Sequence, residues 1–126
     1  MDRRVLSGDD AVARLQERQE AFQRTVAATQ EMATRMRTLT AAASDANGLV
    51  TVTVDSSGVL LGAEFSARIN RTAPEAVSRA LMEALAQAKQ RVAAQTQEVI
   101  AETVGADSET GRAVANDLQA RLGGQR

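Results

Sequence analysis

Cysteine and histidine are both absent from this chain of 126 residues. Without cysteine the protein can form neither a disulfide nor a reactive thiolate, and without histidine it has no imidazole to act as general base or metal ligand. The lack of cysteine also fits a reducing compartment. Nothing marks a serine or threonine as an activated nucleophile. We therefore predict a protein that is not an enzyme and that needs no metal and no cofactor.

Aromatic residues are scarce, since the chain has two phenylalanines and neither tryptophan nor tyrosine. Much of the apolar fraction of 44% is alanine, which buries little surface per residue. A single copy of the chain would therefore have a thin hydrophobic core, which favours an oligomer. The missing rings also argue against binding of single-stranded nucleic acid, because its bases stack on aromatic side chains.

No segment has the apolar run of about 20 residues that a membrane span requires. The first ten residues also lack the apolar stretch of a signal peptide. We therefore expect a soluble protein of the cytoplasm. The formal net charge is only −1, and Lys89 is the single lysine among 15 basic residues.

The centre of the chain, residues 48–69, has the pattern of a β-hairpin. Valines alternate with other residues from Val50 to Val54, as in a strand with one buried face. The sequence Asp-Ser-Ser-Gly at 55–58 is typical of a turn, because Asp and Ser bond to nearby backbone and Gly accepts a positive φ. A second alternating segment covers 59–69. An isolated hairpin is marginal in water, so we expect its own helices or a second copy to complete it.

A long helix is predicted before the hairpin. Ser7 or Asp9 can cap it, and it is expected to continue to about Ala43. Its apolar residues follow alternating steps of three and four, which is the pattern of a coiled-coil seam. At about 1.5 Å per residue this helix would be roughly 50 Å long, so it must protrude or pack along a partner helix.

Two further helices are predicted after the hairpin. The first of them is expected to have Thr72 as its cap, Pro74 in its first turn, and an end at about Thr103. Residues 107–109 can cap a short last helix with a narrow apolar stripe, in which Gly111 weakens the first turn.

The arginines of the first helix offer a candidate binding surface. Arg14, Arg18, Arg24 and Arg35 project within an arc of about 120°. Glutamates overlap this arc, so one interpretation is a solvated, salt-bridged outer face. The other is a surface that contacts phosphates, to which basic residues after the hairpin would add only if the fold brings the two segments together.

The segment Gly48-Leu49-Val50-Thr51-Val52-Thr53-Val54-Asp55, with Gly58 and Leu60-Leu61 after it, resembles the YbaB/EbfC family of bacterial nucleoid-associated proteins. Gln30-Glu31-Met32 and residues 81–89 match the flanking helices of that family, and the resemblance covers about residues 10–103. Ala67-Arg68-Ile69-Asn70 stands where the family usually has Asp-Pro, and residues 104–126 are an addition.

The resemblance implies a tweezer-shaped homodimer that binds DNA, with strands joined across the dimer and helices forming its arms. Similar proteins of actinobacteria accompany type VII secretion systems, which implies an alternative function as an adaptor that binds a protein partner without binding DNA.

We therefore predict an α+β protein with a long helix, a β-hairpin that a third short strand can extend, a second long helix and a short C-terminal helix. Residues 1–8 are expected to be a flexible N-terminus, 9–103 the family domain, and 104–126 an extension that can bind a protein partner. The predicted function is weakly specific binding of duplex DNA in the nucleoid, as a homodimer. The predicted DNA contacts are Arg14, Arg18, Arg24, Arg35, Arg37, Arg68 and Arg71. The predicted dimer interface contains Val12, Leu15, Phe22, Val26, Val50, Val52, Val54, Leu61 and Phe65.

Overall fold

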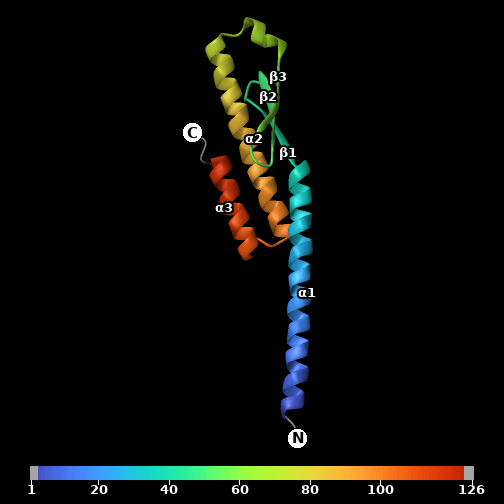
Figure 1. The fold of residues 1–126 in the computed structure, drawn as a ribbon. Helices are drawn as coiled ribbons and strands as arrows, with labels where there is room; N and C mark the ends of the chain where they lie inside the picture. Colours follow the sequence, from blue (N-terminus) through green and yellow to red (C-terminus); the bar gives the residue numbers. More distant parts are fainter. Residues whose placement is uncertain (1–2, 124–126) are drawn as a thin grey trace.

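The computed structural model describes residues 3–123, with side chains from Gly8 onward. A long helix is followed by three antiparallel strands, a second long helix and a shorter third helix (Figure 1), which confirms the predicted α+β class. The elements are α1 (Arg3–Thr38), β1 (Thr40–Ser44), β2 (Val50–Asp55), β3 (Leu60–Phe65), the 3₁₀ helix η1 (Ala67–Arg71), α2 (Pro74–Glu102) and α3 (Glu109–Gly123).

Helix α1 differs from the predicted first helix at both ends. It already includes residues 3–10, so Ser7 and Asp9 lie inside it and do not cap it. It stops at Thr38, and the segment predicted to finish the helix, up to Ala43, forms strand β1 instead. The predicted cap and helix end were therefore wrong, and β1 is the third strand that the prediction had allowed for.

Strand β1 exists because of its neighbours. Ala41 lies opposite Val54 and Ala43 opposite Val52, and both alanines are buried while the residues between them are exposed. Alanine by itself favours helix. Here the edge of β2 supplies the hydrogen-bond partners and α2 covers the alanines, so tertiary contacts decide the conformation.

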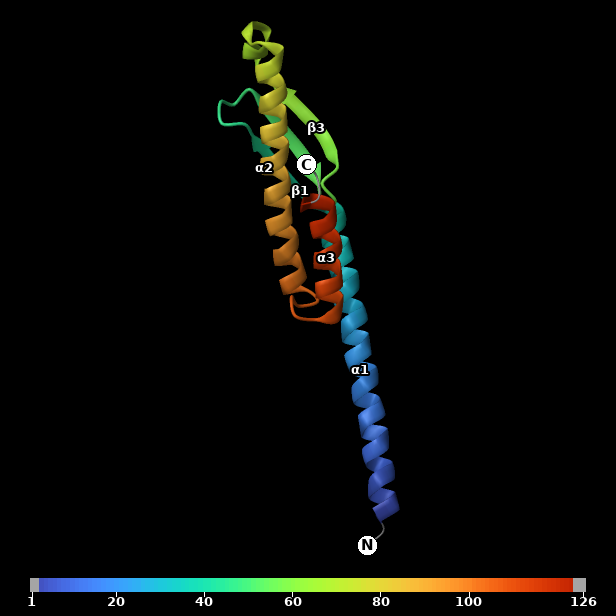
Figure 2. The same cartoon turned by 90° about the vertical axis from the view of Figure 1, so that its left-hand side faces the viewer.

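The hydrophobic core lies between the sheet and α2. The strands have the order β1-β2-β3, and α2 lies across β1 and β2 (Figure 2). Val50, Val52 and Val54 are fully buried, and they face a stripe of small residues on α2. That stripe has a spacing of four residues and contains Ala80, Ala84, Ala88, Val92 and Thr96. Alanine allows the helix to approach the strands closely, which is how a chain with few large side chains closes a core.

Two side-chain carboxylates organise the turns of the sheet. The predicted turn at 55–58 is confirmed, because Asp55 Oδ1 accepts hydrogen bonds from the amides of Ser57 and Val59, both at 2.9 Å, and Gly58 has a φ of 81°. In the β1–β2 loop, buried Asp45 accepts from the amides of Val50 at 2.8 Å and Asn47 at 3.1 Å. The hydrogen bond from Val50 is the main cause that lowers the pKa of Asp45.

Helix α2 begins at Pro74, but its cap residue is Ala73, so the prediction of Thr72 as cap was wrong. The Thr72 hydroxyl instead donates to the carbonyl of Arg68 at 2.6 Å, within the preceding 3₁₀ turn. The predicted end at about Thr103 agrees with the observed last residue, Glu102.

Helix α3 folds back along α2 because the connection between them is a tight, capped turn. Gly105 has a φ of 88°, and Ser108 Oγ accepts from the amide of Gly111 at 2.9 Å, as the predicted cap requires. Gly111 is buried, and a Cβ there would overlap the carbonyl oxygen of Gly105. This glycine is therefore required for the turn. At its other end α3 places Leu122 against Gly58 of the hairpin turn.

Candidate nucleic-acid interface

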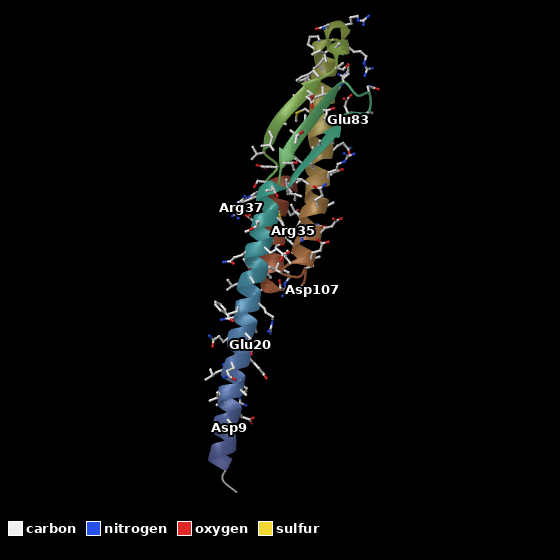
Figure 3. All side chains as sticks on the ribbon, turned by 90° about the vertical axis from the view of Figure 1, so that its right-hand side faces the viewer. Asp9, Glu20, Arg35, Arg37, Glu83 and Asp107 are labelled. Carbon is white, nitrogen blue, oxygen red and sulfur yellow. The ribbon has the colours of Figure 1, made fainter. Side chains whose placement is uncertain are left out.

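The first half of α1 extends beyond the other elements as a bare helix, which we call the arm and define as residues 8–27. Every residue of the arm is exposed. Partial burial begins just beyond it, at Ala28 and Thr29. Met32 is then buried against Val99 and Ile100 of α2. Figure 3 shows Asp9 and Glu20 on the arm, and Arg35 and Arg37 where α1 meets the body. The arm is about 30 Å long at 1.5 Å per residue.

Three of the predicted DNA contacts, Arg14, Arg18 and Arg24, lie on this arm. All three are exposed, and none takes part in an ion pair or a hydrogen bond with another residue that the structure describes. Their guanidinium groups are therefore not engaged by the fold. Such groups suit phosphate, because they carry a permanent charge and several donors in a planar arrangement.

Arg35 and Arg37 stand at the junction of arm and body, and the fold uses at least one of them. Arg35 Nη2 lies 2.6 Å from Glu102 Oε1 at the end of α2, and Nη1 lies 3.8 Å from Glu31. Arg37 is exposed, and its Nη2 donates to Thr34 Oγ1 at 3.2 Å. Arg35 thus ties α1 to α2, and it is a poorer candidate for DNA than the arm arginines.

Arg68 and Arg71 are in η1, at the opposite end of the molecule from the arm (Figure 1, yellow-green). Arg68 donates to the carbonyl of Asn47 and, through Nε, to Ser66 Oγ at 3.4 Å, so it closes the β1–β2 loop. Arg79 on the second turn of α2 is exposed near the same end. Within one chain, the fold does not bring these arginines together with those of the arm.

The two edges of the sheet differ sharply. At the β1 edge, Arg91 Nη1 donates to the carbonyl of Ala42 at 2.6 Å, and Glu83 Oε2 accepts from the amide of Ala46 at 3.1 Å. Figure 3 shows Glu83 beside the sheet. Arg91 therefore occupies a backbone carbonyl of β1 that a further strand would need, and Glu83 holds the β1–β2 loop just beyond the strand. Sequence reasoning missed this role, because the partners are far apart along the chain and carry no local pattern.

The β3 edge is open. Every residue of β3 is exposed, although the strand is largely apolar, and no side chain of the described residues bonds to its outer backbone groups. Leu61 is 55% and Phe65 is 46% exposed. Phe65 pairs with Val50, so it is on the face that α2 covers, but α2 does not extend over β3. An open apolar strand edge is a typical site for strand pairing with another chain.

The predicted dimer interface is thus divided by the structure. Val50, Val52 and Val54 have no exposed surface within the single chain, because α2 covers them. They therefore cannot contact a partner chain directly and can only pack beneath residues that do. The other six are exposed on two separate surfaces, with Leu61 and Phe65 on β3 and Val12, Leu15, Phe22 and Val26 on the arm.

A family model described as the YbaB/EbfC DNA-binding family matches residues 9–107. The chain belongs to this family. This YbaB/EbfC protein is therefore a member of a non-enzymatic DNA-binding family, as the strand motif had indicated. A search of curated proteins and a search of solved structures each gave no match. Helix α3 begins at Glu109, beyond the matched range. Among the described residues, no helix is both long and apolar enough to cross a membrane.

Proposed function

We propose that this YbaB/EbfC protein binds duplex DNA in the nucleoid as a homodimer, with weak sequence preference. The observation that carries the proposal is the arm, where Arg14, Arg18 and Arg24 are exposed and unengaged on a helix that stands clear of the body. Contacts from such residues go mainly to phosphate, which positions a protein on DNA without selecting a sequence. Glu17 and Glu20 on the same arm limit the net positive potential.

The dimer of this proposal joins two β3 edges. Antiparallel pairing of β3 with its copy would give a continuous sheet of both protomers, and it would cover Leu61 and Phe65. The blocked β1 edge leaves β3 as the edge where pairing costs no existing contact. One two-fold axis then generates a closed pair, as in most soluble homodimers.

Duplex binding is tested by fluorescence anisotropy with labelled DNA at several salt concentrations. We expect on the order of three to six phosphate contacts per dimer, and hence a slope of log K against log salt of about −3 to −5. The triple variant Arg14→Gln, Arg18→Gln, Arg24→Gln should weaken binding to every duplex similarly and flatten the slope. Arg112→Gln, which removes an exposed charge from α3, is the control. Equal affinity and slope for the triple variant and the wild type would refute the proposal.

A second function, as an adaptor for a protein partner, is supported by a groove between α2 and α3. The groove has a volume of about 530 Å³, and its lining is mainly apolar, with Met82, Ile100, Leu118 and Leu122, but it also includes Lys89 and several glutamines. It depends on α3, which the family match does not include. If this function is the main one, the wild type will show no salt-dependent DNA binding, and deletion of residues 104–126 will abolish capture of the partner.

A further inference from the structure

The groove between α2 and α3 has the size and lining of a small-molecule site. Helix α3 folds back along α2 (Figures 1 and 2), and the groove between the two helices has a volume of about 530 Å³. Ligand pockets typically have volumes of about 300–1,000 Å³ and are mainly apolar, with a small number of polar groups. The apolar lining includes Leu85, Ala93 and Ile100 on α2 with Leu118 and Leu122 on α3. The groove is therefore suited to an apolar body of limited size.

Among the described residues that line this groove, Lys89 alone carries a charge. Its side chain is half-buried, and it forms no ion pair with another residue that the structure describes. The positions three and four residues away on α2 are all apolar, namely Leu85, Ala86, Val92 and Ala93. No carboxylate is therefore within reach of Lys89 along its own helix. The groove thus contains a cation for which the described part of the fold supplies no counter-ion.

The cation lies at one end of the part of the groove that α3 walls. A Cβ on Gly58 of the hairpin turn would lie 3.7 Å from Lys89 Cε and 2.6 Å from Leu122 Cδ2, so the lysine is level with the end of α3. Ile100 lines the groove farther along α2, about 16 Å from Lys89 at 1.5 Å per residue. An elongated apolar body along this part of the groove would have one end at Lys89 and the other near Ile100.

We propose that the groove binds an acyl chain that ends in a carboxylate, as in a fatty acid. The carboxylate pairs with Lys89, and the chain lies along the apolar side chains toward Ile100. Burial of the chain supplies most of the affinity, and the ion pair selects an anion and fixes the orientation. One lysine balances the single charge of a carboxylate. A phosphate ester, with a charge of about −1.5 to −2, would stay unbalanced beside the carbonyl end of α3.

A small ligand matches the groove better than a helix of a partner protein does. Stable protein interfaces typically involve roughly 20–30 residues on each side. Fourteen described residues line the groove, which is enough to enclose a single chain. The inference depends neither on DNA binding nor on the β3-paired dimer, and the ligand would compete with the adaptor function for the same surface.

Binding would also hold α3 in place, because the ligand contacts both helices. A ligand that binds only the folded arrangement stabilises it in proportion to the logarithm of ligand concentration. We therefore expect the ligand to raise the midpoint of thermal unfolding and to slow proteolysis within residues 104–123.

Isothermal titration calorimetry on the full chain tests the inference, with decanoate kept below the concentration at which it forms micelles. We expect saturable binding of a single decanoate per chain. Decanol, which lacks the charge, and decyltrimethylammonium, which has the opposite charge, should each bind more weakly by about tenfold or more. Wild type that binds decanol as tightly as decanoate, or that binds neither compound, would overturn the inference.

Substitutions of Lys89 test where the carboxylate lies. Lys89→Gln should weaken decanoate binding by about tenfold or more, and Lys89→Arg should retain it. Lys89→Glu should reverse the preference, so that decyltrimethylammonium binds better than decanoate. The matched control is Arg79→Gln, which removes an exposed cation of α2 outside the groove and should behave like the wild type. Equal decanoate affinity of Lys89→Gln and Arg79→Gln would show that Lys89 does not hold the carboxylate, and the inference would be wrong.

Limited proteolysis separates ligand binding from a purely structural role of Lys89 at the C-terminal end of α3, where a cation is favourable. Without ligand, we expect Lys89→Gln to be cleaved within residues 104–123 at the wild-type rate. Decanoate should then protect the wild type and Lys89→Arg but not Lys89→Gln. If Lys89→Gln is cleaved faster without ligand and decanoate leaves wild-type cleavage unchanged, the lysine serves only to hold α3, and the inference is wrong.

Discussion

Arg35 Nη2 lies 2.6 Å from Glu102 Oε1, which joins the point where α1 meets the body to the last residue of α2. An arginine predicted to contact DNA is therefore already paired within the protein. The pair is partly exposed, with 40% of the Arg35 side chain and 58% of the Glu102 side chain accessible. Because it is partly exposed, the pair is expected to supply little stability.

Arg35→Ala should consequently differ from Arg24→Ala. We expect Arg35→Ala to lower the free energy of unfolding by no more than about 1 kcal/mol, as for other exposed ion pairs. It should weaken DNA binding less than Arg24→Ala, which removes an unengaged guanidinium. Urea titration and anisotropy measure the two effects. A larger loss of DNA affinity in Arg35→Ala would show that Arg35 leaves Glu102 and contacts phosphate when DNA binds.

Gly111→Ala should detach α3 without unfolding the sheet. The added Cβ would overlap the Gly105 carbonyl, which is backbone and cannot move aside cheaply. We expect a loss of about 1–3 kcal/mol, similar to other overpacked sites, and faster proteolysis within residues 104–123. Gly62→Ala is the control, because a Cβ there meets nothing within 4 Å. Wild-type proteolysis of Gly111→Ala would show that the α2–α3 turn has room to adjust.

The lowered pKa of Asp45 predicts that the protein loses stability in acid. Amide donors lower its pKa in the folded state, so the unfolded chain takes up the proton first as the pH falls. The stabilisation is complete above the unfolded value of about 3.9, and it is lost as the pH falls further, through the lower folded pKa. Asp45→Asn should lose stability at pH 7 and show a smaller further loss in acid. Urea midpoints between pH 7 and pH 3 measure this, with exposed Asp107→Asn as control (Figure 3).

The β1 edge of the sheet should pair with other chains when the side chains of Glu83 and Arg91 are removed. Glu83→Ala with Arg91→Ala frees the carbonyl of Ala42 in β1 and releases the loop amide of Ala46 next to it, so the β1 edge then resembles the open edge of β3. With two open edges, sheets can extend in both directions, so we expect turbidity and light scattering to increase at equal concentration. The control, Glu98→Ala with Arg112→Ala, removes one acidic and one basic side chain elsewhere, and its solutions should remain clear. Scattering that matches this control would show that the β1 edge is protected by other means.

The elements that depend on local chemistry were predicted well. The turn at 55–58 follows from an aspartate that bonds to nearby amides and from Gly58, and the start of α2 follows from Pro74. A third strand was allowed for but not located: residues 40–43 were assigned to the first helix because the alanines of β1 favour helix, and only the pairing with β2 makes them a strand.

The candidate site was less predictable, because its character depends on what lies far away in the sequence. Arg24 and Arg35 lie on the same side of α1, but only Arg35 pairs with Glu102. Val52 and Phe65 are both apolar strand residues, but α2 covers Val52 and leaves Phe65 exposed. In each pair the local pattern is the same, and the packing of α2 makes the difference.

The bare arm also has consequences for motion. A single helix of this length without tertiary contacts is only marginally stable in water, so the arm should unwind from its tip at temperatures where the body is intact. Amide hydrogen exchange should therefore slow steadily from Gly8 toward Met32, the first buried residue of α1. Binding at the arm would have to complete this helix, and calorimetry would then record a favourable enthalpy opposed by an ordering entropy. Heating would thus unwind the arm well before it unfolds the body.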